Sequence, residues 1–559
     1  MHSFTVYALG VAVAGLVVYA VLDAVAKYDK RYNVQNMPGP RLVPWIGRIH
    51  DLPIEFMWLK FKEWSDMYGP IYRTKMLGDN FVVISDEKLA EEMLVKKAKV
   101  YSDRPEIKSL FDAKSTFGSM EYLPLMGKNR TLTPSGQRIN RTDKTIEYWA
   151  RQRKFTHSYL TGATNVQYNG IMEFEAKRWM ARLLENPDDF SASLEDMCSK
   201  VMCQLTWDDA SLSTPLTPSA WGLLTQMSPA GPITNVLTPL WDYLPEPINP
   251  WKIRERKRHD NQQAFFMECL QNTRRKMEKG QQRACFTKSY LETAEKTNIS
   301  GDYEASCVIG MMALVGIFTV TGPIYYFLIS MVHHPEWQVK CQNEIDRVCG
   351  DKPPSIADLP NLPILRACIK ETMRWKPTVP TGVAHEAEAD DWFHGYFIPK
   401  GTRILPLDYA FLRNPVKYPE PEQFRPERWL EPEWPTFQAP LTKYPDIVGM
   451  TSFGWGQRQC LGMSITRDET VTGCGALMWA FNLKRKIDPV SGQEIEVPLN
   501  KSNSLLIIKP DPWEMAFEPR SAERKQEVIQ LWAEAEAKDK AERAEFARQA
   551  EMEQVLEQP

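Results

Sequence analysis

The 559-residue chain lacks the paired cysteines that indicate a disulfide framework or a zinc site. Its ten cysteines include no Cys-x-x-Cys pair. A chain of this length can also bury enough apolar surface to fold without covalent cross-links. We therefore expect free thiols, most of them buried, and a protein that works in a reducing compartment.

The chain also lacks a large excess of charge of either sign, because 68 Lys and Arg residues nearly balance 71 Asp and Glu residues, which gives a net charge of -3. No basic tract stands out, so electrostatics do not favour a nucleic-acid partner. No internal repeat or long Gly/Ser linker divides the interior. With 43% hydrophobic and 25% charged residues, the chain is typical of one large globular domain.

A long uncharged run does occur at the N-terminus, from Phe4 to Leu22, and it is about long enough to cross a bilayer. A cleaved signal peptide is the competing interpretation. Almost no positive charge precedes the run, whereas Lys27, Lys30 and Arg31 follow it. This asymmetry favours a membrane anchor with the rest of the protein in the cytosol.

Turn and strand signals follow the run. Met37–Pro40, then Pro44 and Gly47, predict a stiff, non-helical elbow. Short β-rich stretches on either side of Gly78-Asp79-Asn80 predict a hairpin over residues 71–85. A second strand pattern spans residues 397–407. Residues 415–440 are proline-rich and irregular, as a functional loop would be.

Helical patterns dominate from about residue 145, so the expected fold class is mainly α with small β-sheets (α+β). Residues 307–333 are nearly all apolar and predict a helix buried on all sides. A second membrane span is the alternative, but the interior Pro323 and the charged stretch that follows favour a core helix. A helix ending before Pro377 is expected in 351–376. Beyond Ser521 an exposed helix is expected, and a solvated extension is favoured over a partner-binding element.

The segment Phe-Gly-Trp-Gly-Gln-Arg-Gln-Cys-Leu-Gly, residues 453–462, carries the main chemical signal. It places Cys460 among glycines, directly before an apolar helical run. A thiolate is stabilised at a helix N-terminus by the backbone N–H groups and the helix dipole. Arg458 adds a cation two residues away. For the other nine cysteines we expect inert buried thiols.

This segment resembles the haem-binding signature of the cytochrome P450 family, Phe-x-x-Gly-x-Arg-x-Cys-x-Gly, at every fixed position. The resemblance implies that Cys460 ligates the iron of haem b and that Arg458 pairs with a propionate. Phe453, Gly456 and Gly462 would belong to the same cofactor-binding loop. The resemblance extends over about residues 38–520, and the sequence is most similar in style to microsomal and fungal biosynthetic members of the family.

The implied organisation is a cytochrome P450 fold with a single catalytic domain behind a transmembrane helix. The expected boundaries are 1–26 for the anchor, 27–50 for a basic and proline-rich hinge, 51–520 for the haem-thiolate domain and 521–559 for a charged helical tail. The anchor and elbow imply an endoplasmic reticulum membrane protein with a cytosolic catalytic domain.

Two further motifs support the resemblance. Glu371 and Arg374 match the family's Glu-x-x-Arg helix motif, and their spacing of three places them on one helix face. Residues 421–429 resemble the family's meander segment, where Arg428 would join the pair in a buried ion network. Removing one member would leave an unpaired buried charge, so we expect loss of haem incorporation.

Further propionate donors are implied by the same resemblance. Trp149 and Arg153 match a Trp-x-x-x-Arg motif whose two side chains reach a propionate. His385 lies where the family commonly offers another donor. A histidine satisfied by its local surroundings explains His385 equally well.

The ligand implies the reaction. A thiolate pushes electron density onto iron and favours O–O cleavage. The chain shows no flavin or nicotinamide fingerprint, so the resemblance implies an NADPH–cytochrome P450 reductase, with cytochrome b5 as a second candidate donor. Arg151 and Lys154 could help the reductase to dock near Cys460, or could be solvated charges.

The chain departs from the family in its central helix. The family usually has Ala/Gly-Gly-x-Asp/Glu-Thr, and this chain has Val-Gly-Ile-Phe-Thr at residues 315–319. Thr319 is retained, fifteen residues before His334, but Phe318 replaces the acid and cannot relay a proton. Either protons travel through Thr319 with water or a substrate hydroxyl, which we favour slightly, or the product is a desaturated or rearranged molecule.

The expected substrate is a lipophilic small molecule, oxidised with O2, and specialised metabolism is favoured over xenobiotic or fatty-acid oxidation. In relatives the pocket is lined by five segments, here about 108–142, 221–249, 314–319, 379–383 and 502–506, which are largely apolar. A reductase-independent isomerase or dehydratase is the rival enzyme. A non-catalytic haem-binding membrane scaffold is the rival from another class.

Overall fold

The computed structural model describes residue 15 and residues 33–43, 46–105, 148–160, 163–227 and 246–556. The expected anchor, apart from Gly15, lies outside these described residues, and so does the expected substrate segment 108–142. The chain divides into two compact units. The first takes its described residues from 1–105, 380–411 and 454–459, and the second takes them from 106–379, 412–453 and 460–559.

The first unit is built on a four-stranded sheet. Strands β1 (Ile71–Met76) and β2 (Asp79–Ile84) form the predicted antiparallel hairpin around Gly78. Strand β6 (Arg403–Pro406) pairs with β2 in parallel, and β3 (His385–Glu386) pairs with β6 in antiparallel fashion. This sheet therefore unites segments more than 300 residues apart, since Ile84 pairs with Pro406.

The strand pattern over 397–407 is confirmed in two parts, because β6 is preceded by a separate hairpin of β4 (Asp391–Phe393) and β5 (Tyr396–Ile398). Short helical segments complete this unit: η2 (Ile49–Asp51), α2 (Met57–Tyr68), α3 (Glu87–Ala90), the π-helical η3 (Glu91–Lys96), α4 (Ala98–Tyr101), α17 (Asp408–Phe411) and η12 (Gly456–Arg458).

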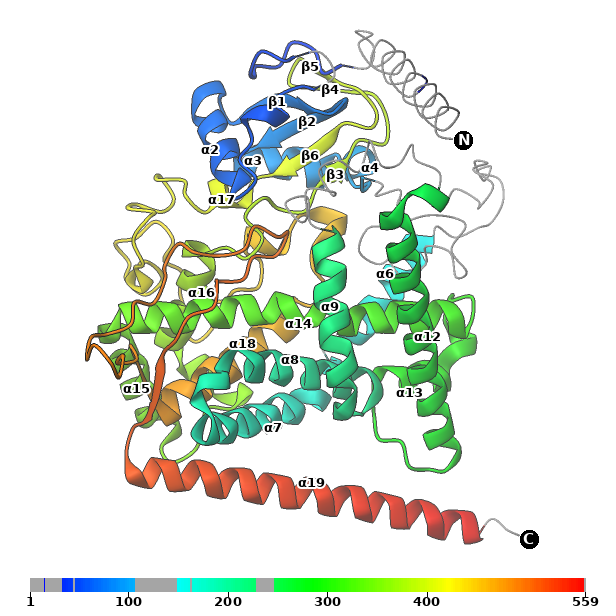
Figure 1. Ribbon diagram of the computed structural model, residues 1–559, viewed down its shortest axis with the longest axis vertical. Coiled ribbons are helices and arrows are strands. Elements are labelled where there is room, and N and C mark those ends of the chain that lie inside the picture. The colour runs from blue at the N-terminus through cyan, green and yellow to red at the C-terminus, as the bar shows by residue number, and fades with distance from the viewer. Residues whose placement is uncertain are drawn as a thin grey trace, which may run out of the picture. The chain divides into compact units, whose positions relative to one another are not determined.

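The second unit is helical, and α14 (Asp302–His333) runs through it (Figure 1). It packs against α8 (Phe190–Trp207) and α18 (Met463–Ala480), and α7 (Ala163–Glu185) packs on both of these. Among the described residues, α14 is the one helix that is long and apolar enough to cross a membrane. Its most apolar window is 83% buried inside the protein, so it is the predicted core helix.

The remaining helices of this unit surround that core: α6 (Tyr148–Leu160), α9 (Ser213–Met227), α12 (Pro250–Glu278), α13 (Phe286–Thr293), α15 (Pro335–Cys349), α16 (Pro363–Trp375) and α19 (Ala522–Leu556). Short 3-10 segments connect them: η5 (Pro187–Asp189), η6 (Ala210–Leu212), η7 (Glu246–Ile248), η8 (Ala294–Lys296), η9 (Ile356–Asn361), η10 (Pro426–Trp429) and η11 (Thr451–Phe453). A two-stranded sheet pairs β7 (Phe481–Lys484) with β8 (Ala516–Pro519).

The C-terminal helix α19 corrects one expectation. A solvated extension was favoured, and most of the helix is exposed, but its first half packs against α7. Val528 is 1% exposed, and the ring of Trp532 lies 5.4 Å from that of Phe174. Farther along, Asp539 pairs with Arg283 at 3.1 Å. The tail is therefore part of the helical unit.

Candidate active site

Cys460 is held at the end of a tight loop. Its backbone N–H donates to the carbonyl of Phe453 at 2.7 Å, which closes the loop just before α18 begins at Met463. Gly456 has a φ of +54°, and a Cβ there would lie 2.3 Å from the carbonyl oxygen of Leu94. Only glycine fits at this position, both for its backbone angle and for its space.

Accessibility distinguishes Cys460 from the other cysteines. All ten belong to the described residues, and Cys460 alone is exposed, whereas eight are buried and Cys349 is half-buried. Burial nevertheless raises the pKa of Cys460, while the Gly462 N–H and the charge of Arg153 lower it. A small group can therefore reach a sulfur that protein largely surrounds, as a metal-ligating thiolate requires.

Arg153 lies on α6, near this sulfur. Its guanidinium is 5.7 Å from the ring centre of Trp149, one turn earlier on the same helix. Burial lowers the pKa of Arg153, and the electrostatic effect of Cys460 raises it. The predicted Trp-x-x-x-Arg pair therefore shares one helix face, and its arginine interacts with the candidate ligand.

Arg151, by contrast, does not serve as an exposed docking charge. Its Nε and Nη2 donate to the two carboxylate oxygens of Glu304 at 3.0 and 2.6 Å. The Arg151 side chain is only 12% exposed, and that of Glu304 is fully buried. Arg151 is therefore bound to Glu304 and is not the exposed charge that either expectation required, while Lys154 is exposed.

The central helix α14 is open at one place. Between Glu304 and Met331, every residue is buried except Val315, Gly316 and Thr319. These three residues are half-buried: Val315 and Thr319, four positions apart, lie on one helix face, while Gly316 lies against Met202, whose Sδ would be 2.6 Å from a Cβ at that position. Thr319 donates from its hydroxyl to the carbonyl of Val315 at 2.8 Å, and its oxygen still has accepting capacity.

Phe318, at the family's acid position, is not one of these half-buried residues. It is 4% exposed, and its ring lies 6.0 Å from that of Trp221 on α9. Its ring therefore fills space behind the open face, where it excludes water.

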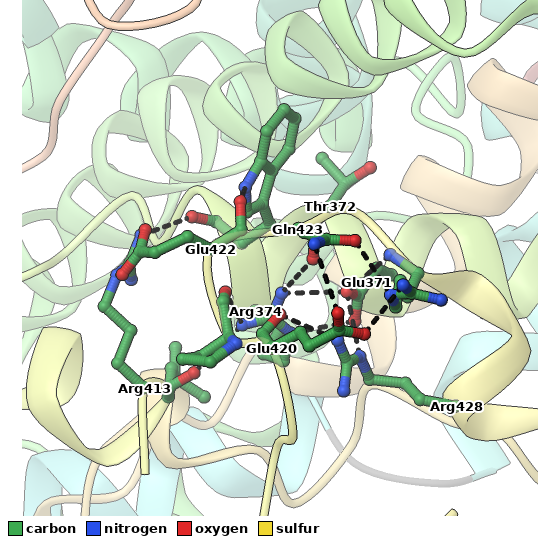
Figure 2. A network of polar contacts seen from close by, with 12 residues as sticks. Glu371, Thr372, Arg374, Arg413, Glu420, Glu422, Gln423 and Arg428 are labelled. Carbon is green, nitrogen blue, oxygen red and sulfur yellow. Dashed lines mark hydrogen bonds and ion pairs between the residues drawn. The ribbon is translucent and has the colours of Figure 1, made fainter. Parts of the chain in front are cut away.

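The predicted ion network is present in the helical unit, and Figure 2 shows it from close by. Glu371, Arg374 and Arg428 all have fully buried side chains. Arg374 donates to both carboxylate oxygens of Glu371 at 2.8 Å, and Arg428 Nε donates to Oε1 at 3.0 Å. The pair is placed by α16, whose first N–H groups, those of Ile364 and Leu365, donate to Glu344.

Two partners of this network were not predicted. Trp429 Nε1 donates to Glu371 Oε2 at 3.0 Å, and the backbone N–H of Arg425 donates to Oε1 at 2.9 Å. Glu371 thus accepts from four different residues, which is what a buried carboxylate needs. Trp429 follows Arg428 directly in the meander segment, and this adjacency was the available signal.

The first unit holds a separate cluster of buried basic residues around Ser102. Arg458 Nε donates to the carbonyl of Ser102 at 2.7 Å, and Arg104 Nη1 donates to those of Val383 and Ala384 at 3.0 and 2.6 Å. Arg458 and Arg104 are 7% and 4% exposed. The sequence alone predicted no role for Arg104.

His385 joins the same cluster. Its Nδ1 lies 2.8 Å from the carbonyl of Tyr101, so Nδ1 carries the hydrogen. Burial, and then the charge of Arg104, lower the pKa of His385 well below its usual value. Donation to a propionate would therefore require a second proton on Nε2, and the alternative of a locally satisfied histidine stays open.

Comparison with known proteins decides the family. A family model described as cytochrome P450 matches residues 37–515. The chain belongs to this family.

Several relatives are cytochrome P450 monooxygenases of fungi. The monooxygenase virE of Hypocrea virens is 29% identical over 523 residues, which cover 91% of this chain and 89% of its own. The monooxygenase claR of Ampulloclitocybe clavipes is 30% identical over 519 residues, or 88% of each chain. This cytochrome P450 is therefore an oxidoreductase of the monooxygenase class, with the helix-rich fold predicted.

The described residues fit the haem that the family implies. In the helical unit, Cys460 offers an accessible sulfur beside an N–H donor and Arg153. In the other unit, Arg458 and Arg104 are buried guanidinium groups of the kind that binds carboxylates. The first set suits thiolate ligation of an iron, and the second is of a kind that suits a propionate.

Proposed function

We propose that this cytochrome P450 is a membrane-anchored haem-thiolate monooxygenase that oxidises a lipophilic small molecule of specialised metabolism. Cys460 would ligate the iron of haem b, and an NADPH-dependent flavoprotein reductase would supply the electrons. The supporting observation is that Cys460 is the one exposed cysteine of ten, in a loop that closes onto the N-terminus of α18.

When bound, a thiolate-ligated haem supplies the oxidising power for oxygen insertion. The protein's part is to hold that group. The Gly462 N–H and Arg153 stabilise the negative sulfur. Arg153, Trp149 and Arg458 would hold the propionates, with His385 as a further candidate donor.

Residues from several expected substrate segments border one core cluster of the helical unit. Partly buried apolar residues of these segments pack against the core cluster that contains Phe318: Trp221, Val315, Val379, Leu505 and Leu506. Leu461, next to Cys460, packs against the same cluster. Half-exposed apolar side chains gathered beside a ligand loop support the proposal of a lipophilic substrate.

The reduced carbon monoxide difference spectrum tests the ligand. The full chain should show the red-shifted band from which the family takes its name. Cys460→Ser should lose this band, and Cys349→Ser, a change at a half-buried thiol, should keep it. A band that survives in the Cys460 variant would exclude this ligand assignment.

Consumption of NADPH and oxygen with added reductase separates the rival functions. A monooxygenase consumes both when substrate is present. An isomerase or dehydratase converts its substrate without consuming NADPH or oxygen. A scaffold neither converts a substrate nor consumes NADPH and oxygen. Retention of Thr319 in the open face of α14 supports the first outcome.

A further inference from the structure

A polar cluster lies behind Phe318 in the helical unit. It joins four segments: Glu195 of α8, Trp221 of α9, Tyr325 of α14, and Lys509 of the turn after 502–506. None of these side chains belongs to the ligand loop or to the Glu371 network. Their shared feature is that each contacts another member directly.

Lys509 is the cation at the centre of this cluster. Its ammonium group forms an ion pair with Glu195 Oε1. It also lies 5.2 Å from the ring centre of Trp221 and 5.1 Å from that of Tyr325. One cation thus binds a carboxylate and two aromatic faces, which ties the C-terminal turn to three helices.

Glu195 in turn orients the indole of Trp221. Trp221 Nε1 donates to Glu195 Oε2 at 3.0 Å, and the hydroxyl of Tyr325 lies 3.2 Å from Oε1. Burial, and then the charge of Glu195, raise the pKa of Tyr325 well above its usual value, so this hydroxyl keeps its proton. Glu195 Oε2 therefore holds the Trp221 indole, whereas the Tyr325 hydroxyl also lies 2.9 Å from the Ser191 carbonyl and 2.8 Å from the Ser191 hydroxyl.

The pair is better shielded than an ordinary surface salt bridge. The side chains of Glu195 and Lys509 are 14% and 26% exposed. Exposed pairs contribute little because water and salt screen them, whereas charge-assisted bonds in partial burial are stronger. The cluster can therefore hold Trp221 in one position.

Trp221 connects this cluster to the substrate side. Its ring lies 6.0 Å from that of Phe318, at 45°, and it packs against the same core cluster as Val315 and Leu506. We propose that Glu195 and Lys509 form a latch that holds Trp221 against Phe318 and so fixes one wall of the substrate chamber. These are positioning residues, and the inference rests on the proposed function of that chamber.

Two haem-binding probes of different size test the latch in the full haem-loaded chain. Imidazole reports only on access to the iron, whereas 4-phenylimidazole also places a ring against the chamber wall. Both dissociation constants are measured by the shift of the haem absorption band. We expect Lys509→Met to weaken 4-phenylimidazole about tenfold, equivalent to ~1.4 kcal/mol, and to leave imidazole within about twofold.

Matched variants make the test specific. Lys509→Arg keeps the charge and should restore the wild-type ratio of the two constants. Trp221→Phe keeps a ring but loses the N–H, and should reproduce the Lys509→Met ratio. Lys501→Met removes an exposed lysine of the same turn and should change neither constant. If Lys509→Met does not fold with haem, Trp221→Phe decides the same comparison.

The outcomes are distinguishable. An unchanged ratio in both Lys509→Met and Trp221→Phe overturns the latch. A wild-type chain that shows no shift with imidazole overturns the proposed haem function instead. In thermal unfolding, Glu195→Gln and Lys509→Met should be non-additive, and additive losses would also contradict the latch.

Discussion

Phe318 is the residue that sets this chain apart chemically. The family's acid at this position helps to move protons, and a buried phenyl ring cannot. The structure places the ring against Trp221 and leaves Thr319 as the hydroxyl in the open face of α14. The favoured explanation is that protons travel through Thr319 and water or a substrate hydroxyl.

Phe318→Asp tests this explanation. We expect less hydrogen peroxide per NADPH oxidised, because an acid is returned to the proton route, and an unchanged product profile. Phe318→Leu is the control, since it removes the ring without adding an acid. New products from the Asp variant alone would support a specialised rearrangement role for Phe318.

Glu469 on α18 is a second unusual residue, a carboxyl group 2% exposed beside the Cys198 thiol. Burial raises the pKa of Glu469 to about 8, so the group is protonated at neutral pH. The folded state then binds a proton that the unfolded state, with a usual pKa of 4.5, has released. Stability from this group is therefore present below pH 4.5 and is lost as pH rises towards 8.

We expect Glu469→Gln to flatten the decline of thermal stability between pH 4.5 and about 8, because glutamine does not titrate. Part of the slope should remain, since burial also raises the pKa of the nearby Glu175 to about 7. Glu433→Gln, at an exposed position, is the control. Melting temperatures across this range measure the effect, and parallel curves for Glu469→Gln and wild type would contradict it.

At the scale of elements, α16 and the meander segment are joined by a few buried charges. Arg428 reaches Glu371 across 57 residues of sequence, and each has a fully buried side chain. Loss of either partner leaves the other charge without compensation in the interior.

Arg428→Leu should therefore cost about 3–5 kcal/mol and abolish haem incorporation rather than merely slow turnover. Arg425→Leu is a matched control three residues away, because its side chain pairs with Glu420 at the surface, where such pairs contribute about 0–1 kcal/mol. The measurement is the ratio of bound haem to purified protein in each variant. A normally loaded Arg428 variant would argue against a structural role for the network.

The C-terminal helix α19 lies beyond residue 515, where the family match ends. Its contacts with α7 give it a structural function: Val528 is buried, Trp532 meets Phe174, and Arg178 lies 5.2 Å from the Trp532 ring. A helix docked in this way covers apolar surface that would otherwise be exposed.

A chain ending after Arg520 should thus be less stable by about 3 kcal/mol, from lost burial of one or two apolar side chains. Lys538→Ala, at a position 77% exposed, should have no effect. Thermal unfolding of the two proteins is the measurement. Equal stability of the truncated and full chains would show that α19 does not support the domain.

At the scale of the whole molecule, the first question is attachment to the membrane. Residues 4–22 precede Lys27, Lys30 and Arg31, and we propose that they anchor the protein in the endoplasmic reticulum with its catalytic domain in the cytosol. Deletion of residues 1–26 should move much of the protein to the soluble fraction. The sequon at Asn298 should stay unglycosylated in the full chain. A glycan there would show that this part of the chain faces the lumen, which contradicts the proposed topology.

Much of this cytochrome P450 was determined by the sequence itself, because the signals are local. Consecutive residues encode each of three features: the Cys460 loop, the hairpin around Gly78 and the apolar core helix. Glu371 and Arg374 pair at a spacing that helix geometry imposes. The family and its cofactor follow from such stretches.

Contacts between distant segments were decided only by the tertiary structure. Arg151 pairs with Glu304 across 153 residues, and Glu195 meets Lys509 across 314 residues. Whether α19 packs or stays solvated depends on Phe174, far from Trp532 in sequence. Such pairs leave no local pattern, because charges and rings find their partners only after the chain has folded.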